Sequence, residues 1–171
     1  VAGLDDIFCG KFRPGHFSGV ATVVTRLFHI TEPDVALFGE KDYQQLLVIR
    51  RLVRDLCLPV AIEGIPTVRE DDGLALSSRN QYLSETERTT APLLYKALLQ
   101  ISGEIKKGHM DYANLERAGI AQLTQAGFRP EYISIRRASD LGDAGDDRNL
   151  VVLAAAWLGR TRLIDNVLAG R

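Results

Sequence analysis

The sequence predicts an α/β fold in which parallel strands with crossover helices are followed by a small α+β domain. Helix-type and strand-type hydrophobic patterns alternate from Val20 to Ile65, which is typical of parallel strands joined by helices. After Pro66 the pattern changes to helices followed by β-type runs, the last two of which flank the hairpin signal Gly159-Arg160-Thr161. These observations place helices on a small antiparallel sheet in the second domain.

The first domain, residues 1–68, is expected to contain two helices and two strands. An amphipathic helix capped by Ser18 is predicted from apolar residues at i, i+3, i+4, i+7 and i+8, namely Val20, Val23, Val24, Leu27 and Phe28. A short buried strand follows at Val35 to Phe38. Next come a helix from about Asp42, with Leu46, Ile49, Val53 and Leu56 facing inward, and a strand at Val60 to Ile65. Because parallel sheets normally carry several strands and are buried on both faces, this pattern indicates only the second half of such a domain.

The second domain, residues 69–171, begins with a charged, aperiodic stretch. A capping box, S-x-x-E, at Ser84 to Glu87 predicts a helix start, and Pro92 is expected either to kink that helix or to begin a new one. Asp111 is expected to cap a further helix that ends near Gly127. Three strands are then predicted, at Tyr132 to Arg137, Leu150 to Leu158 and Arg162 to Leu168.

The composition is ordinary for a soluble globular protein, with 46% apolar and 25% charged residues. The 21 Lys and Arg residues nearly balance the 22 Asp and Glu residues, which gives no reason to expect a nucleic acid or an anionic membrane as partner. The longest apolar run, Leu150 to Leu158, is too short to span a bilayer, and no signal peptide is visible. Cys9 and Cys57 do not suit a disulfide framework or a zinc site, so we expect reduced thiols and a cytoplasmic location.

Two polar loops, each following a β-type run, are candidates for phosphate binding. In Gly39-Glu40-Lys41-Asp42-Tyr43-Gln44-Gln45, the glycine allows close backbone approach, the helix start suits an anion and Lys41 adds a positive charge. Asp42 offers an acceptor for a hydroxyl, and Gln45 offers an amide that both donates and accepts. In Leu76-Ser77-Ser78-Arg79-Asn80, two hydroxyls precede a guanidinium that forks onto phosphate oxygens. Each loop alone also fits a solvated turn before a helix.

These loops and the preceding Arg13-Pro14-Gly15-His16-Phe17, in this order and spacing, resemble the pantoate–β-alanine ligase family. The resemblance continues to the C-terminus through Ala155-Ala156-Trp157-Leu158-Gly159 and Arg162-Leu163-Ile164-Asp165-Asn166. The family begins with a further N-terminal segment that carries an H-x-x-H nucleotide motif, and this sequence lacks it. Since residue 1 is Val and the only methionine is Met110, we expect a fragment or a processed chain.

The resemblance implies that residues 1–68 are the second half of a Rossmann-like nucleotide-binding domain. It implies an ATP-dependent ligase that condenses pantoate with β-alanine through a pantoyl-adenylate, with release of AMP and pyrophosphate. Mg²⁺ is expected to arrive with ATP, with no metal site of the protein's own. A cytoplasmic homodimer is also implied. The isolated chain is expected to be inactive without the N-terminal half of the same protein.

The same resemblance assigns site residues. ATP contacts are expected at Gly39, Glu40, Lys41, Asp42, Val68, Leu76, Ser77, Ser78 and Arg79, with Lys41 and Arg79 as the catalytic residues and Gln45 holding pantoate. For Val68 and Leu76 the residue types suggest only backbone contacts, and a core position is the default. His16 shares a turn with Arg13, but a lone turn histidine is more often structural, so neither is assigned a role.

Two alternatives stay open. One is a related adenylate-forming nucleotidyltransferase that uses a different acid, against which Gln45 in the D-Y-Q-Q run and the R-P-G-H-F run both argue. The other is a non-catalytic fragment that needs its missing N-terminal half.

Overall fold

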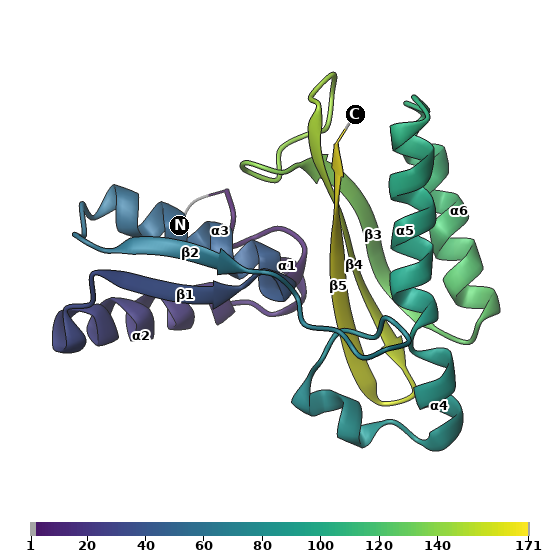
Figure 1. The fold of residues 1–171 in the computed structure, drawn as a ribbon, viewed down its shortest axis with the longest axis horizontal. Helices are drawn as coiled ribbons and strands as arrows, with labels where there is room; N and C mark the ends of the chain where they lie inside the picture. The colour runs from purple at the N-terminus through teal and green to yellow at the C-terminus, as the bar shows by residue number, and fades with distance from the viewer. Residues whose placement is uncertain (1–2, 171) are drawn as a thin grey trace. The chain divides into compact units, whose positions relative to one another are not determined.

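The computed structural model describes residues 3–170 and divides into two compact units, Val1–Pro66 and Thr67–Arg171. Both contain helices and strands, and the predicted α/β class is confirmed (Figure 1). In chain order the first unit contains α1 (Cys9–Phe12), α2 (His16–Thr31), β1 (Val35–Gly39), the 3₁₀ helix η1 (Glu40–Asp42), α3 (Tyr43–Asp55) and β2 (Ala61–Ile65). The second contains the 3₁₀ helix η2 (Ser78–Tyr82), α4 (Glu85–Thr90), α5 (Leu93–Lys106), α6 (Tyr112–Gln125), β3 (Arg129–Arg137), β4 (Asn149–Leu158) and β5 (Thr161–Gly170).

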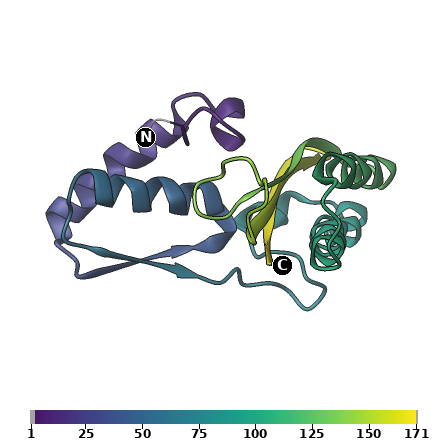
Figure 2. The same ribbon diagram turned by 90° about the horizontal axis from the view of Figure 1, so that it is seen from above.

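In the first unit, β1 and β2 form a two-stranded parallel sheet, in which Val35 lies opposite Ala61 and Gly39 opposite Ile65. Helices α2 and α3 lie on the same side of these strands (Figure 2). The buried face of α3 supplies most of the unit's core, led by Leu46 and Ile49, which are 1% and 0% exposed. The predicted order of helix, strand, helix and strand is therefore correct.

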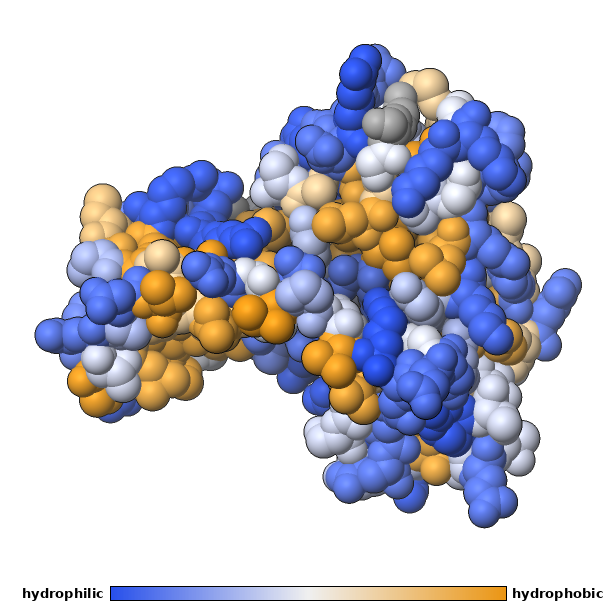
Figure 3. All heavy atoms as spheres, in the orientation of Figure 1, coloured by the Kyte–Doolittle hydropathy of each residue, from blue (hydrophilic) through white to orange (hydrophobic). Residues whose placement is uncertain are grey.

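The other face of this small sheet is open, so the prediction of a buried strand at Val35 to Phe38 is wrong. Burial alternates along both strands, and Leu37 is 61% exposed. Hydrophobic atoms are visible over β1 and β2 in the space-filling view (Figure 3). Helices cover one face of the strands, and within the residues described no element of this unit covers the second face.

Two helix boundaries in the first unit also differ from the prediction. Helix α2 starts at His16 rather than after Ser18, because Gly15 takes a left-handed conformation (φ 78°) and turns the chain into the helix without a side-chain cap. Leu56, expected to face inward from α3, is 52% exposed. It lies beyond the last helical residue, Asp55, where the helical stripe no longer fixes its direction.

The second unit packs α5 and α6 on an antiparallel sheet of order β3-β4-β5. The predicted capping box is present, since the Ser84 hydroxyl accepts the Glu87 N–H and the Glu87 carboxylate accepts the Ser84 N–H. Pro92 begins a new helix, because α4 ends at Thr90 and Pro92 is the N-cap of α5. Asp111 caps α6 through the Asn114 N–H, as predicted.

The β4–β5 hairpin turns at Gly159, where the backbone is left-handed with φ 54°. A Cβ at this position would lie 1.8 Å from Oε1 of Glu87. The left-handed turn therefore favours glycine, and a larger residue would displace the Glu87 carboxylate.

Glu131 on β3 forms a half-buried cluster with Trp157 on β4 and Arg162 on β5. Its Oε1 accepts the Trp157 indole N–H at 2.7 Å, and its Oε2 accepts Arg162 Nη2–H at 2.8 Å. Burial alone would raise the pKa of the Glu131 carboxyl, but the hydrogen bonds from Arg162 and Trp157 outweigh it and hold the pKa below its usual range. A group whose pKa is lower in the folded state stabilises the fold above its unfolded pKa, and this contribution disappears as pH falls through the folded value.

We therefore expect Glu131→Gln to lower the free energy of unfolding at neutral pH by about 1–3 kcal/mol, the range for hydrogen bonds to a charged group. The deficit should shrink as the pH falls below about 4.3, the usual pKa of an unfolded glutamate, and disappear below the lower folded pKa. Urea unfolding at neutral and acidic pH measures both values. The exposed Glu63→Gln is the matched control and should change stability by less than about 0.5 kcal/mol. A Glu131→Gln deficit of equal size at both pH values would contradict the expectation.

Two further sequence expectations concern the whole chain. None of the helices within residues 3–170 has the length and apolar character needed to cross a bilayer. Cys9 is half-buried and Cys57 exposed, and no disulfide joins them.

Candidate active site

The predicted site residues fall into two groups, one in each unit. The first follows β1, where Gly39 leads into the 3₁₀ turn η1 and then into α3. Gly39 has φ −66° and ψ 132°, a conformation open to any residue, and a Cβ built there would meet nothing within 4 Å. Neither strain nor crowding within the described chain demands glycine at this position. The open space beside its backbone is available for a ligand to approach.

Gly64 on β2, which sequence reasoning missed, lies close to the Glu40 side chain. It lies opposite Phe38, and a Cβ there would be 2.8 Å from Oε1 of Glu40 and 3.2 Å from Leu46. The Glu40 side chain therefore passes over β2 at the one position that has no side chain. A glycine inside a strand pattern is the available sequence signal for such a close approach.

Adjacent glutamines at the start of α3 have opposite environments. Gln44 is 5% exposed; its Nε2 donates to the carbonyls of Leu4 and Ile7 at 2.7 and 2.8 Å, and its Oε1 accepts the Cys9 N–H. It therefore fastens residues 4–9 to α3. The half-buried Gln45 side chain makes no hydrogen bond with any residue in the described range 3–170, which leaves its amide available for a ligand.

The charged part of this first group is more exposed. Asp42 is exposed and Lys41 is half-buried, within η1. The α-helix begins at Tyr43, so a 3₁₀ turn separates Lys41 from Gln45 and they are not related by a uniform α-helical turn. Burial raises the pKa of the Tyr43 phenol, and the nearby Glu40 carboxylate adds to the rise against the opposing charge of Arg50.

The second group lies on a tight hairpin from Val68 to Leu76. The Leu76 N–H donates to the Val68 carbonyl at 2.9 Å, and Arg69 pairs with Ala75 in an antiparallel bridge. At the tip Gly73 has φ 94° and donates to the Glu70 carbonyl. The hairpin thus brings together two predicted ATP contacts, Val68 and Leu76, that lie eight positions apart in the sequence.

The expectation of core positions for these two residues is wrong. Val68 is 61% exposed and Leu76 51% exposed, whereas Ala75 beside them is 3% exposed. Along an extended strand neighbouring side chains point to opposite sides, so burying Ala75 turns its neighbour outward. An apolar side chain at each end of the hairpin is left facing solvent.

Ser77, Ser78 and Arg79 continue directly from the hairpin into η2. The Ser77 hydroxyl accepts the Arg79 N–H at 3.2 Å and so caps this 3₁₀ turn. Ser78 and Arg79 are exposed, with no side-chain hydrogen bond or ion pair to any residue between 3 and 170. The Ser77 hydroxyl therefore shapes the turn, whereas the Ser78 hydroxyl and the Arg79 guanidinium lie at the surface.

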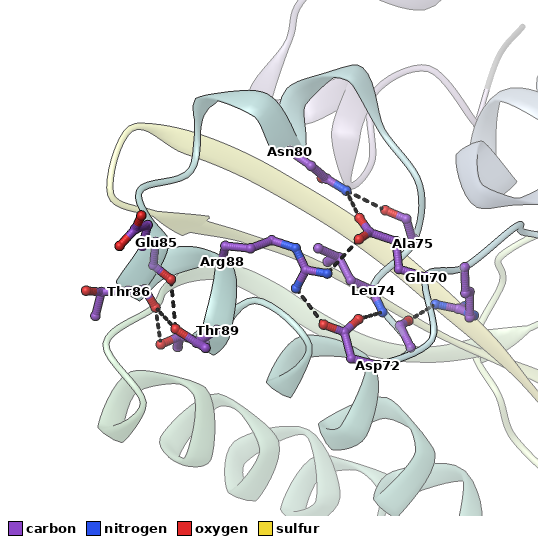
Figure 4. A network of polar contacts seen from close by, with 12 residues as sticks. Glu70, Asp72, Leu74, Ala75, Asn80, Glu85, Thr86, Arg88 and Thr89 are labelled. Carbon is purple, nitrogen blue, oxygen red and sulfur yellow. Dashed lines mark hydrogen bonds and ion pairs between the residues drawn. The ribbon is translucent and has the colours of Figure 1, made fainter.

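Polar side chains hold the hairpin and η2 together (Figure 4). Arg88 of α4 donates to Glu70 at 2.6 Å and to Asp72 at 2.5 Å, and Asp72 also accepts the Leu74 N–H. The hydrogen bonds from Arg88 and Leu74 hold the pKa of Asp72 below its usual range. Asn80 of η2 donates its amide to both Glu70 and the Ala75 carbonyl. These hydrogen bonds and ion pairs hold residues 68–79 in place, and we call this stretch the braced segment.

The remaining features have no assigned role. Arg13 Nη1 and His16 Nε2 are 3.2 Å apart, which pairs the two side chains at the start of α2. Two open hollows flank Arg88, and their lining comes from Glu70 to Asp72 and from the stretch 85–96, not from Ser77 to Arg79. Across residues 3–170 no three His, Cys, Asp or Glu side chains are grouped closely enough to hold a metal ion.

Comparisons with known proteins agree on one family. The family model for pantoate–β-alanine ligase matches residues 1–168. The pantothenate synthetases of Pseudomonas putida strain GB-1 and Azotobacter vinelandii are 58% and 61% identical to this chain over 168 residues, 98% of its length. The chain spans 58% and 59% of these two relatives.

Solved structures give the same result. Pantothenate synthetase from Thermus thermophilus is 47% identical and superposes on the whole chain with a TM-score of 0.94, and the chain covers 62% of it. The pantoate–β-alanine ligase of Francisella tularensis, complexed with β-γ ATP and β-alanine, is 35% identical over 97% of this chain and 55% of its own, with a TM-score of 0.75. The chain belongs to the pantoate–β-alanine ligase family.

Proposed function

We propose that this chain is the C-terminal part of an ATP-dependent ligase that joins pantoate to β-alanine. A carboxylate is a poor acylating agent, so ATP first adenylates pantoate and releases pyrophosphate. The β-alanine amine then attacks the acyl-adenylate, and AMP leaves. The relatives' shared name and the ATP and β-alanine in the Francisella complex support these substrates.

The observation that carries the proposal is the braced segment from Val68 to Arg79. It presents the ends of a hairpin, a serine hydroxyl and a guanidinium side by side on an ordered scaffold, without intramolecular partners for the last two within residues 3–170. Donors that are available at the surface of an ordered backbone can bind phosphate oxygens, where charge builds in the transition state. We assign Arg79, Ser77, Ser78, Leu76 and Val68 to the nucleotide.

The residues of the first group are assigned to the same substrates. Lys41 places a positive charge at the ATP phosphates, and Asp42 accepts from the ribose hydroxyls. Gly39 and Glu40 belong to the same nucleotide-binding stretch. The open space at Gly39 lets the ligand come close to the main chain. Gln45, whose amide makes no other hydrogen bond within the described residues, holds pantoate.

The proposal extends to the assembly around the site. Residues 1–68 form the second half of a Rossmann-like domain, residues 69–171 a small C-terminal domain, and the whole enzyme is a cytoplasmic homodimer. The ATP phosphates carry Mg²⁺, since oxygen ligands suit it and the described residues offer no cluster of their own. We call the protein with both this chain and its N-terminal segment the complete enzyme.

Pyrophosphate exchange tests the order of chemistry. The complete enzyme should incorporate labelled pyrophosphate into ATP when pantoate is present and β-alanine is absent, because adenylation precedes the amine. Gln45→Ala should weaken the exchange chiefly by raising the pantoate concentration needed, with the ATP requirement changing much less. Gln100→Ala, at an exposed residue in the middle of α5, is the matched control and should leave both requirements unchanged.

Each failure of this test has a distinct meaning. An acyl-phosphate mechanism would release ADP and show no exchange. Exchange that proceeds equally well without pantoate would discard the substrate assignment and leave the nucleotide site standing.

A further inference from the structure

Arg69 lies in the first strand of the Val68–Leu76 hairpin and forms an ion pair with the sheet. Of the ion pairs made by residues of this hairpin, it is the least exposed. Nη1 and Nη2 of Arg69 donate to Oδ2 and Oδ1 of Asp165 on β5 at 2.7 and 2.9 Å. The two side chains are 18% and 3% exposed. Paired parallel hydrogen bonds of this kind fix the direction of the guanidinium as well as its position.

Further contacts hold the same guanidinium. Nη1 also donates to the Gly73 carbonyl at the hairpin tip, and Nη2 lies 3.4 Å from the Asn166 carbonyl. The guanidinium carbon is 3.6 Å from the centre of the Tyr95 ring on α5, which is a cation–π contact. Gly73 packs on the same ring, since a Cβ there would be 2.8 Å from it. One side chain therefore ties the two strands of the hairpin to both the sheet and a helix.

The position of Arg69 in the hairpin gives these contacts a consequence for the site. Arg69 is next to Val68 and pairs with Ala75, which is next to Leu76. Beyond Leu76 the chain enters the Ser77–Arg79 turn directly. A shift at Arg69 must therefore move both ends of the hairpin and the start of η2. The Arg88 network reaches the tip and Asn80, but its hydrogen bonds and ion pairs include no residue of β5 or α5 within the described residues.

We propose that Arg69, held by Asp165 and Tyr95, is a positioning residue that sets the placement of the nucleotide-binding segment on the rigid sheet of the second unit. This inference rests on the proposed function, because it assumes that Val68 and Leu76 to Arg79 bind ATP. Arg69 itself touches no substrate. Its guanidinium is enclosed by protein groups on the edge facing Asp165 and on the face over Tyr95.

Arg69→Lys and Asp165→Asn in the complete enzyme test the proposal. Lysine keeps the charge but loses the two-pronged geometry, and asparagine keeps the shape but loses the charge. In pantoate-dependent pyrophosphate exchange, the KM for ATP should rise about tenfold or more, since displacement of a binding group by a fraction of an ångström is costly. The KM for pantoate should change less than about twofold, because Gln45 lies in a different segment.

Glu131→Gln is the matched control. It disrupts another ion pair of this unit whose side chains are only 14% and 12% exposed, but none of its partners lies in the hairpin. It should lower stability and leave the KM for ATP unchanged. Hydrogen exchange provides a readout without turnover: the Leu76 amide, which is bonded to Val68, should exchange faster in Arg69→Lys than in Glu131→Gln.

The outcomes separate the inference from the proposed function. If the unaltered complete enzyme shows no pantoate-dependent exchange, the proposed function fails. If it does, and the folded Arg69→Lys and Asp165→Asn variants keep the KM for ATP, the positioning role is overturned. Should both variants fail to fold, Tyr95→Leu removes the ring beneath the guanidinium and leaves the ion pair, and a KM for ATP equal to that of the unaltered enzyme would overturn the role.

Discussion

Lys41→Ala in the complete enzyme should lower kcat for adenylation by about a hundredfold or more, the loss typical of removing one electrostatic donor from a transition state. Negative charge builds on the α-phosphate and on the departing pyrophosphate during this step. The ammonium of Lys41, in the turn after β1, would stabilise that charge in the transition state. Single-turnover formation of the acyl-adenylate measures the effect directly.

A matched control separates charge at the site from charge in general. Lys106→Ala removes an exposed lysine from the last turn of α5 and should leave kcat within about twofold. Circular dichroism of both variants establishes that they fold. A folded Lys41→Ala enzyme with the kcat of the unaltered protein would show that Lys41 is a solvated residue at the start of a helix.

The sequence predicts most of the fold because its strongest signals are local. The capping box at Ser84 and the turn at Gly159 depend on residues a few positions apart, and both are found as expected. In α5 the apolar residues at helical spacing, Leu94, Leu98, Ile101 and Ile105, are likewise buried. Signals of this kind decide the type of an element whatever packs around it.

Predictions that depended on distant partners were less successful. The exposure of Leu37 depends on whether another layer covers its face of the sheet, which no pattern within β1 reveals. Gln44 and Gln45 are identical in type and adjacent, yet only Gln44 is buried against residues 4–9. Arg69 and Asp165 are 96 positions apart. The one signal available for this pair was an acidic residue inside the apolar pattern of β5.

The candidate site was predicted better as a set of segments than as a geometry. Residue chemistry predicts Lys41, Ser77, Ser78 and Arg79 as phosphate ligands. The structure leaves the side chains of Ser78 and Arg79 without partners within the described residues, whereas the Ser77 hydroxyl caps η2. Residue chemistry does not reveal that Val68 and Leu76 meet across a hairpin, because the hydrogen bond between them joins two backbone groups. Their role as ATP contacts, like the convergence of the two groups on one nucleotide, stays a prediction.

The second large effect concerns the N-terminal segment. The purified chain of 171 residues should bind ATP weakly and make no detectable pantothenate, and added N-terminal segment should restore turnover. The chain spans 58% of the Pseudomonas relative, and parallel sheets are normally buried on both faces. Here the two-stranded sheet exposes Val35, Leu37 and Ile65 at 46%, 61% and 39%. We expect the added segment to extend this sheet and to cover its open face.

Two substitutions test that surface. Leu37→Lys places a charge on the open face of β1 and should abolish restoration, because burying an unpaired ammonium costs several kcal/mol. Leu99→Lys, at a residue 44% exposed on α5 of the other unit, is the matched control and should be restored like the unaltered chain. Both variants should unfold at the same urea concentration as the unaltered chain. Full turnover by the chain alone would refute the requirement, and restoration of Leu37→Lys would show that the segment docks elsewhere.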